Sequence, residues 1–165
     1  SQIVMFLINR GKEFFVFATM PEVSGGIESW SKEGDIGALR SHFGNFHGDA
    51  KTVLYACDET FQTALYERNP LSRWSEGAVT LIGDACHAMM PFMAQGAAMG
   101  LEDAVVLSRC VDTSEEWSTA IRRYEGTRIE RTSKIQLGSN QNEWLREAGN
   151  PDWVYGYDAW MVTLD

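Results

Sequence analysis

The chain has 165 residues, of which 44% are hydrophobic, and it carries a formal net charge of -9. This length corresponds to about one domain, and the apolar share is sufficient for a core. The negative charge and the lack of a Lys/Arg cluster argue against nucleic acid or an anionic membrane as a partner. No segment approaches the roughly 20 apolar residues of a membrane span.

The three cysteines, Cys57, Cys86 and Cys110, are widely spaced and include no C-x-x-C pair. A disulfide framework or a zinc site is therefore not expected, and we assign no metal ligands. The start of the chain lacks the basic region and the cleavage site of a signal peptide. The sequence therefore predicts a cytoplasmic protein.

The first region predicts an antiparallel β-hairpin. Two β-favouring apolar runs, at 3–8 and 14–19, flank a polar connection at 9–13. The first run begins abruptly at the start of the chain, which fits a truncated protein.

A short helix is expected after this hairpin. The segment 21–34 is rich in glycine, serine and charge and predicts a loop. Asp35 is placed to cap a helix that buries Ile36, Leu39 and Phe43.

The second half of the chain has clearer patterns than the segment 53–68, which is ambiguous. A turn at 74–77 precedes a short, nearly all-apolar run at 78–82, which is typical of an inner strand with both faces covered. Apolar residues then recur at helical spacing over 96–111. The polar stretch 115–147 predicts one long helix or two.

Asp84 follows Gly83 at the carboxyl end of the expected strand, where ligands bind in open α/β sheets. A carboxylate at this place can accept hydrogen bonds from two hydroxyl groups of a ribityl chain. The alternative interpretation is that Asp84 only caps the following turn. The residue taken alone leaves both interpretations open.

The run Gln95-Gly96-Ala97-Ala98 opens the predicted helix. Small residues allow a ligand to approach the backbone closely. The first amides of a helix have no internal partner, and the helix dipole favours negative charge there. This helix start would suit the electron-rich edge of a reduced flavin, and the alternative is simply a tightly packed helix with glycine at its start.

Pro91 would stiffen the loop between Asp84 and that helix. One interpretation is that Pro91 and the neighbouring Phe92 form a wall against a flavin ring and an aromatic substrate. The other is that Pro91 is an ordinary loop proline whose apolar neighbours pack onto the core.

Several other polar residues are predicted to be structural. Cys86 and His87 are adjacent, and neighbours on an extended strand point to opposite faces, so a nucleophile–base pair is not expected. Glu102 and Asp103 fit the general preference for acids in early helical turns. The segment 128–131 is predicted to lie on a solvated helix face. We therefore assign no catalytic residue.

The order and spacing of these elements resemble the second flavin motif of the single-component FAD-dependent aromatic hydroxylases. The matching residues are Gly77, Leu81-Ile82-Gly83-Asp84-Ala85, His87, Pro91, Gln95-Gly96-Ala97 and Glu102-Asp103-Ala104. The preceding segment also resembles that family, at Leu65-Tyr66, Arg68, Pro70-Leu71 and Trp74. The tail at 151–158 resembles the end of the salicylate hydroxylase and 6-hydroxynicotinate 3-monooxygenase branch.

The resemblance implies roles for individual residues. Asp84 would hold the ribityl chain of FAD, Pro91 would lie beside the isoalloxazine ring, and the amides of Gly96 and Ala97 would face its pyrimidine edge. The residues expected to bind FAD are Gly83, Asp84, Pro91, Gln95, Gly96, Ala97 and Ala98. Pro91 and Phe92 are the residues expected to contact substrate.

The resemblance also implies a reaction. NADH or NADPH reduces FAD, and O2 then forms a flavin C4a-hydroperoxide that hydroxylates an aromatic ring, here a substrate of the aromatic carboxylate type. The cofactor performs the oxygen chemistry, while the protein orients the substrate and excludes water. Two alternatives stay open: another oxidoreductase of the same flavin fold, such as an epoxidase, halogenase or reductase, and a non-catalytic binding module of that fold.

The implied fold class is α/β (an α+β fragment), the carboxyl-terminal part of an FAD-binding hydroxylase fold. We expect part of the substrate-binding sheet domain at 1–74, the end of the FAD-binding domain at 75–112 and a helical segment at 113–165. The sequence contains no G-x-G-x-x-G fingerprint of a dinucleotide-binding βαβ unit. We therefore expect a fragment that is inactive alone, needs the amino-terminal half of the same protein and can form a homo-oligomer.

Overall fold

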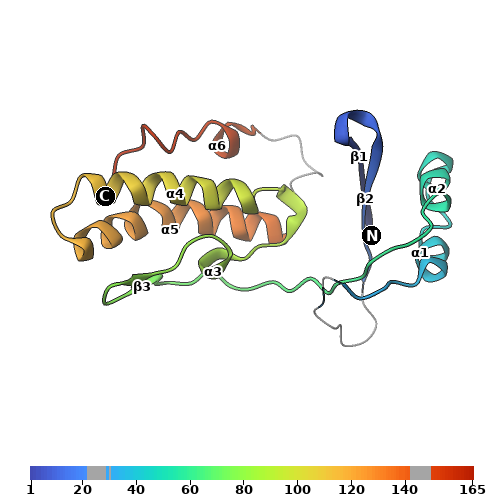
Figure 1. Ribbon diagram of the computed structural model, residues 1–165, viewed down its shortest axis with the longest axis horizontal. Coiled ribbons are helices and arrows are strands. Elements are labelled where there is room, and N and C mark those ends of the chain that lie inside the picture. The colour runs from blue at the N-terminus through green and yellow to red at the C-terminus, as the bar shows by residue number, and fades with distance from the viewer. Residues whose placement is uncertain (22–28, 30, 142–149) are drawn as a thin grey trace. The chain divides into compact units, whose positions relative to one another are not determined.

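The computed structural model describes residues 1–21, 29, 31–141 and 150–165 (Figure 1). The chain divides into two compact units, Ser1–Leu65 and Tyr66–Asp165. Helices and small antiparallel sheets both occur among the described residues, which confirms the predicted α/β class. The three-part domain assignment stays a prediction.

The first unit begins with the predicted hairpin. Strands β1 (Gln2–Ile8) and β2 (Glu13–Thr19) pair antiparallel. The connection contains a 3-10 turn, η1 (Asn9–Gly11), in which all three residues have positive φ angles. Asparagine and glycine tolerate this left-handed backbone better than other residues, which explains why the chain reverses here.

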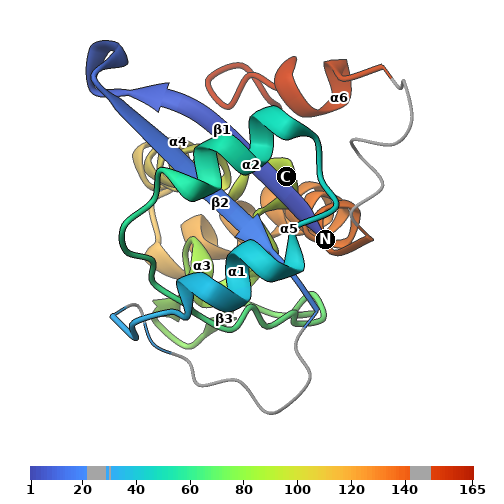
Figure 2. The same ribbon diagram turned by 90° about the vertical axis from the view of Figure 1, so that its right-hand side faces the viewer.

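Helices α1 (Ile36–His42) and α2 (Gly48–Tyr55) cover one face of this hairpin (Figure 2). The predicted cap of α1 is confirmed, because Oδ1 of Asp35 accepts a hydrogen bond from the Ala38 amide at 2.9 Å. Buried Leu39 and Phe43 pack with Leu54 of α2, as expected for the first two. The sequence analysis did not predict α2. This helix buries only Leu54, so its sequence has no apolar residues repeating at helical spacing to indicate it.

The second unit is built on two long helices. Helix α4 (Gly96–Asp112) packs along α5 (Trp117–Gln141), as Figure 1 shows. The helix predicted at 96–111 is thus confirmed. The segment 115–147 forms one helix as far as Gln141, and 142–149 lie outside the described residues. None of the helices in the described part of the chain combines the length and apolar content needed to cross a membrane.

Two clusters of buried side chains form the core of this unit. The first contains Trp74, Cys86, Val106, Cys110, Ala120 and Tyr124. The second contains Met93, Met99, Ile135 and Val154. Both clusters join α4 and α5 to segments that precede or follow them in the chain, including helices α3 (Asp84–His87) and α6 (Asp152–Tyr155).

The strand predicted at 78–82 is shorter than expected. Only Val79–Thr80 forms a strand, β4, and it pairs antiparallel with β3 (Ser75–Glu76) in a two-stranded sheet. Val79 is 67% exposed and Ile82 is 41% exposed, so the described residues do not cover both faces of this run, and its predicted burial stays a prediction. An inner strand needs neighbours on both edges, and β3 is the one neighbour that the described chain supplies.

Arginine side chains attach the C-terminal segment to α4 and α5. Arg109 donates to the carbonyl oxygens of Ala159 and Val162, at 2.7 and 2.9 Å. Arg131 donates in the same way to Trp153 and Val154, at 2.7 and 2.9 Å. These charge-assisted bonds hold a segment that has little regular structure of its own apart from one short helix, Asp152–Tyr155.

The cap of α1 gives a local stability test. Replacing Asp35 by alanine removes the acceptor for the Ala38 amide, at a cost of about 1 kcal/mol to the helix. We expect amide hydrogen exchange within α1 to become about fivefold faster. The control is Asp58→Ala, which removes the same charge from an exposed position outside the helices. Equal exchange rates in the two variants would contradict the capping role.

Candidate functional site

Asp84 is the first residue of α3 and its side chain is exposed. The sequence placed it at the end of a regular strand, whereas the structure places it on a short helix that follows β4. Gly83 precedes it with φ 61° and ψ -139°. This backbone conformation strongly favours glycine, so Gly83 is what lets the chain turn from Leu81 and Ile82 into α3.

The structure brings Asp84 to the start of α4. A Cβ atom built on Gly96 would lie 3.9 Å from Oδ1 of Asp84. The first amides of a helix have no acceptors within the helix. Gln95, which precedes α4, does not supply one through its side chain. The exposed Asp84 carboxylate thus lies beside the start of α4, and the predicted role of both in binding FAD stays a prediction.

The remaining predicted residues surround this helix start. Gln95 is buried and its Nε2 donates to the Met93 carbonyl at 3.4 Å, so its side chain supports the loop. Ala97 is exposed, whereas Ala98 is half-buried. Small side chains therefore line the first turn of α4, and the backbone there stays accessible.

Pro91 opens the 3-10 turn η2 (Pro91–Met93) and is exposed, while Phe92 is half-buried. Side chains of α5 fix the loop around it. Gln136 donates to the Ala88 carbonyl at 2.8 Å, and Ser139 donates to the Met90 carbonyl. The loop that carries Pro91 is therefore held by polar groups as well as by the proline ring.

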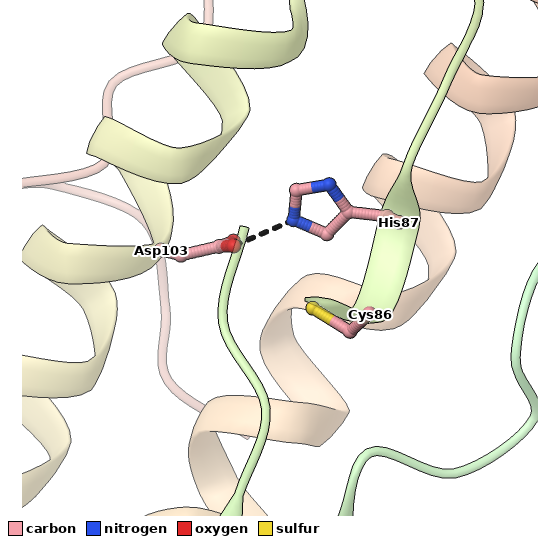
Figure 3. A group of neighbouring side chains, drawn as sticks. All are labelled: Cys86, His87 and Asp103. Carbon is pink, nitrogen blue, oxygen red and sulfur yellow. Dashed lines mark hydrogen bonds and ion pairs between the residues drawn. The ribbon is translucent and has the colours of Figure 1, made fainter. Parts of the chain in front are cut away.

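Asp103 of α4 is buried and contacts several polar groups, and Figure 3 shows its side chain facing the ring of His87. Its Oδ2 accepts hydrogen bonds from Nε2 of His87 at 2.6 Å and from the Gly83 amide at 3.0 Å. Its Oδ1 accepts from Nε of Arg128 at 2.8 Å. An ionised carboxylate cannot donate, so Nε2 of His87 carries the proton in this pair.

The charge state of Asp103 follows from these contacts. Burial favours the neutral carboxyl and raises its pKa, but the hydrogen bonds from His87, Arg128 and the Gly83 amide outweigh burial and hold the pKa below its ordinary value of 3.8. Burial likewise opposes the charge of Arg128, but Asp103 and Glu102 raise the pKa of its guanidinium. The cluster is therefore an ion pair.

A second acid extends the cluster. Glu102 accepts from Arg128 at 2.6 Å and from Arg131 at 2.8 Å. The Arg131 guanidinium carbon also lies 3.9 Å from the ring centroid of Tyr157, in the C-terminal segment. These two neighbouring acids of α4 are therefore matched by two arginines of α5.

The prediction of a solvated face at 128–131 is wrong. Arg128 is 0% exposed, and Arg131 is 11% exposed in its side chain. A signal was available, because Arg128 stands at i+4 from Tyr124 and at i-7 from Ile135, which are both buried in α5. The apolar stripe of α5 thus passes through an arginine, and such a position predicts a buried partner acid.

The side chains of Cys86, His87 and Asp103 are a group that could in principle hold a metal, since their ligand atoms lie within 4.8 Å of one another. Two features disfavour this. Both oxygens of Asp103 are already occupied by hydrogen bonds. Burial and the charge of Asp103 raise the pKa of the Cys86 thiol to about 12, so neither a thiolate ligand nor a thiolate nucleophile is available.

Comparison with known proteins gives three informative matches. A family model described as an FAD binding domain matches residues 12–131. The chain is 38% identical over 165 residues to the 6-hydroxynicotinate 3-monooxygenase of Bordetella bronchiseptica, covering 98% of this chain and 43% of that protein. It also resembles a salicylate hydroxylase solved as a substrate complex, with 25% identity and a TM-score of 0.79, over 95% of this chain and 45% of the other.

A further solved structure contains the cofactor. Klebsiella pneumoniae HpxO, complexed with FAD and uric acid, matches with 25% identity and a TM-score of 0.61, over 74% of this chain and 33% of that one. The chain thus spans less than half the length of these relatives. The matches confirm the resemblance and the fold predicted from the sequence.

The buried Asp103 predicts an acid-dependent loss of stability. Because its folded pKa lies below 3.8, its ionised form adds stability that is fully present above about pH 4 and is lost as the pH falls through the lower folded value. Asp103→Asn leaves Arg128 without its partner and should cost about 3–5 kcal/mol at pH 7.

This cost should shrink as the pH falls below about 4, in thermal unfolding measured from pH 7 to pH 3. Asp112→Asn, at an exposed position on the same helix, serves as the control. A stability difference between Asp103→Asn and the unmodified protein that stays constant over this range would contradict the ion pair.

Proposed function

Because the chain belongs to the FAD binding domain family, we propose that it forms the carboxyl-terminal part of a flavoprotein monooxygenase. This enzyme hydroxylates an aromatic substrate of the carboxylate type, using NADH or NADPH and O2. The observation that carries the proposal is the meeting of the Asp84 carboxylate with the start of α4 at Gly96. The names of two relatives, a 6-hydroxynicotinate 3-monooxygenase and a salicylate hydroxylase, support the substrate class.

The exposed groups at this place fit the flavin end of FAD. Asp84 offers two carboxylate oxygens to ribityl hydroxyls, and hydrogen bonds to an ionised acceptor are the stronger kind. Gly96 has no side chain to keep a planar ring from the backbone. The free amides and the dipole of α4 stabilise negative charge on a ring edge placed there.

FAD, when bound, supplies the activation of O2 with electrons from NADH or NADPH. The chain's own residues bind the cofactor and shield the reacting atoms from water. Pro91 and Phe92 would form a wall against the ring and the substrate, and their loop is fixed by Gln136 and Ser139 of α5. A fixed apolar wall keeps water from the reacting atoms without a cost of ordering at each turnover.

The adenine and pyrophosphate end of FAD needs a second site. No segment of this sequence matches the G-x-G-x-x-G fingerprint of such a site. We assign this site to the rest of the protein, since the relatives are more than twice as long as the segment matched here. On this account residues 1–165 alone bind FAD weakly and do not turn over. Apolar surface left without the rest of the protein would also favour self-association of the isolated chain.

The activity is tested on the full-length protein. NADH and NADPH oxidation is measured with salicylate, hydroxybenzoates and hydroxynicotinates, and products are identified by mass. We expect an aromatic carboxylate to stimulate oxidation and to gain one oxygen atom, while phenol, which lacks the carboxylate of salicylate, does not. FAD-loaded protein that hydroxylates none of these compounds would contradict the proposed substrate class.

The role of Asp84 has its own test. Asp84→Ala in the full-length protein removes a charged acceptor worth about 1.5–3 kcal/mol, so FAD affinity should fall roughly tenfold to a hundredfold. Cys86→Ala, on the same short helix, should retain FAD and nearly full turnover because its thiol is buried and protonated. FAD retention in the first variant, with loss of activity in the second, would reverse these assignments.

A further inference from the structure

The proposed function leaves one buried cluster without a role. Asp103 is 0% exposed and lies further along α4 than its first turn. One of its oxygens, Oδ2, accepts from the Gly83 amide at 3.0 Å and from His87 at 2.6 Å. Gly83 immediately precedes α3 and His87 ends it. A single oxygen of α4 therefore holds both ends of the short helix whose first residue is Asp84.

One face of α4 carries the glycines and the acid that contact this segment. Gly96, Gly100 and Asp103 stand at positions i, i+4 and i+7, which place them on the same side of a helix. A Cβ atom on Gly96 would lie 3.9 Å from Oδ1 of Asp84, and one on Gly100 would lie 3.8 Å from the Cα of Gly83. The segment from Gly83 to His87 thus lies against α4 in one register, with Asp103 as its polar anchor.

Asp103 is itself held from the opposite side. Nε of Arg128 binds its Oδ1 at 2.8 Å, and other guanidinium nitrogens bind Glu102 at 2.6 Å and the Met99 carbonyl at 3.3 Å. The carboxylate therefore cannot rotate away without leaving a buried charge unpaired, which is costly. A chain of polar contacts runs from α5 through Asp103 to Gly83 and His87.

We propose that Asp103 is a positioning residue that fixes the Asp84 carboxylate at the start of α4, acting through the Gly83 amide and His87. This inference rests on the proposed role of Asp84 in binding FAD. Gly83 is the point at which this segment could most easily change conformation, because glycine, which here has a positive φ, can adopt many backbone angles. The anchor removes that freedom, so the carboxylate is already in place when the ribityl chain arrives.

A double-mutant cycle in the full-length protein tests the coupling. FAD dissociation constants are measured by flavin fluorescence for the unmodified apoprotein, Asp84→Ala, Asp103→Asn and the double variant. We expect Asp103→Asn to weaken FAD binding about tenfold in the unmodified background and less than about threefold in the Asp84→Ala background, because the carboxylate that Asp103 positions is then absent. A purely structural role would give the same factor in both backgrounds and would overturn the proposal.

A second variant covers the case in which Asp103→Asn does not fold. His87→Phe keeps a ring in the same buried space and leaves the Asp103–Arg128 pair intact, but it removes one donor to Oδ2. The same dependence on Asp84 is expected. The matched control is Asp112→Asn, which removes an exposed charge from the same helix without touching the Asp103 cluster, and which should change FAD affinity less than about twofold.

The outcomes separate this proposal from the proposed function. If Asp84→Ala binds FAD as tightly as the unmodified protein, the proposed role of Asp84 fails. If Asp84→Ala weakens binding but the effects of Asp103→Asn or His87→Phe simply add to it, the proposed function stands and the positioning role of Asp103 fails.

Discussion

The buried ion pair between Asp103 and Arg128 is the interaction on which the second unit depends. Both side chains are 0% exposed, and each has lost its hydration. A pair of this kind is stable only when further hydrogen bonds satisfy the remaining donors and acceptors. Asp103 accepts two of these bonds, from the Gly83 amide and from His87, and Arg128 donates the others, to Glu102 and the Met99 carbonyl. The pair is therefore stable in the buried core only when α3 and α5 are both packed against α4 in this arrangement.

Arginine side chains also join the helices of this unit to one another and to the C-terminal segment. Arg128 joins α5 to α4, while Arg109 and Arg131 bind carbonyl oxygens of the C-terminal segment. The planar guanidinium presents five donors in a fixed fork, so one arginine binds several acceptors in a defined geometry. The C-terminal segment therefore depends on side-chain donors where it lacks backbone pairing, and the Tyr157 ring adds an apolar cover over Arg131.

Local signals in the sequence were sufficient for much of the fold. The hairpin, the Asp35 cap and helix α4 each rest on residues close together in the chain, and each is confirmed. Helix α2 lacks such a signal, since it buries only Leu54. The run at 78–82 is apolar as an inner strand should be, but in the described residues it forms only the short strand β4, which pairs with β3 alone.

For the site too, some features were predictable from the sequence and others were not. The resemblance assigned Asp84 and Gly96 to the flavin end of one FAD molecule, which stays a prediction, and the structure places the two residues side by side. The partnership of Asp103 with Arg128 was missed, because it joins residues of two helices that are distant in sequence. Periodicity located Arg128 on a buried stripe of α5, but it cannot state which acid lies opposite.

The most direct test of this account is a crystal structure of the full-length protein with FAD bound. The account predicts a carboxylate oxygen of Asp84 within about 3.2 Å of a ribityl hydroxyl, with the flavin edge at the amides of Gly96 and Ala97. It also predicts that the contact between the Gly83 amide and Asp103 persists. A flavin bound elsewhere, with Asp84 directed to solvent and the start of α4 covered by protein side chains, would contradict it.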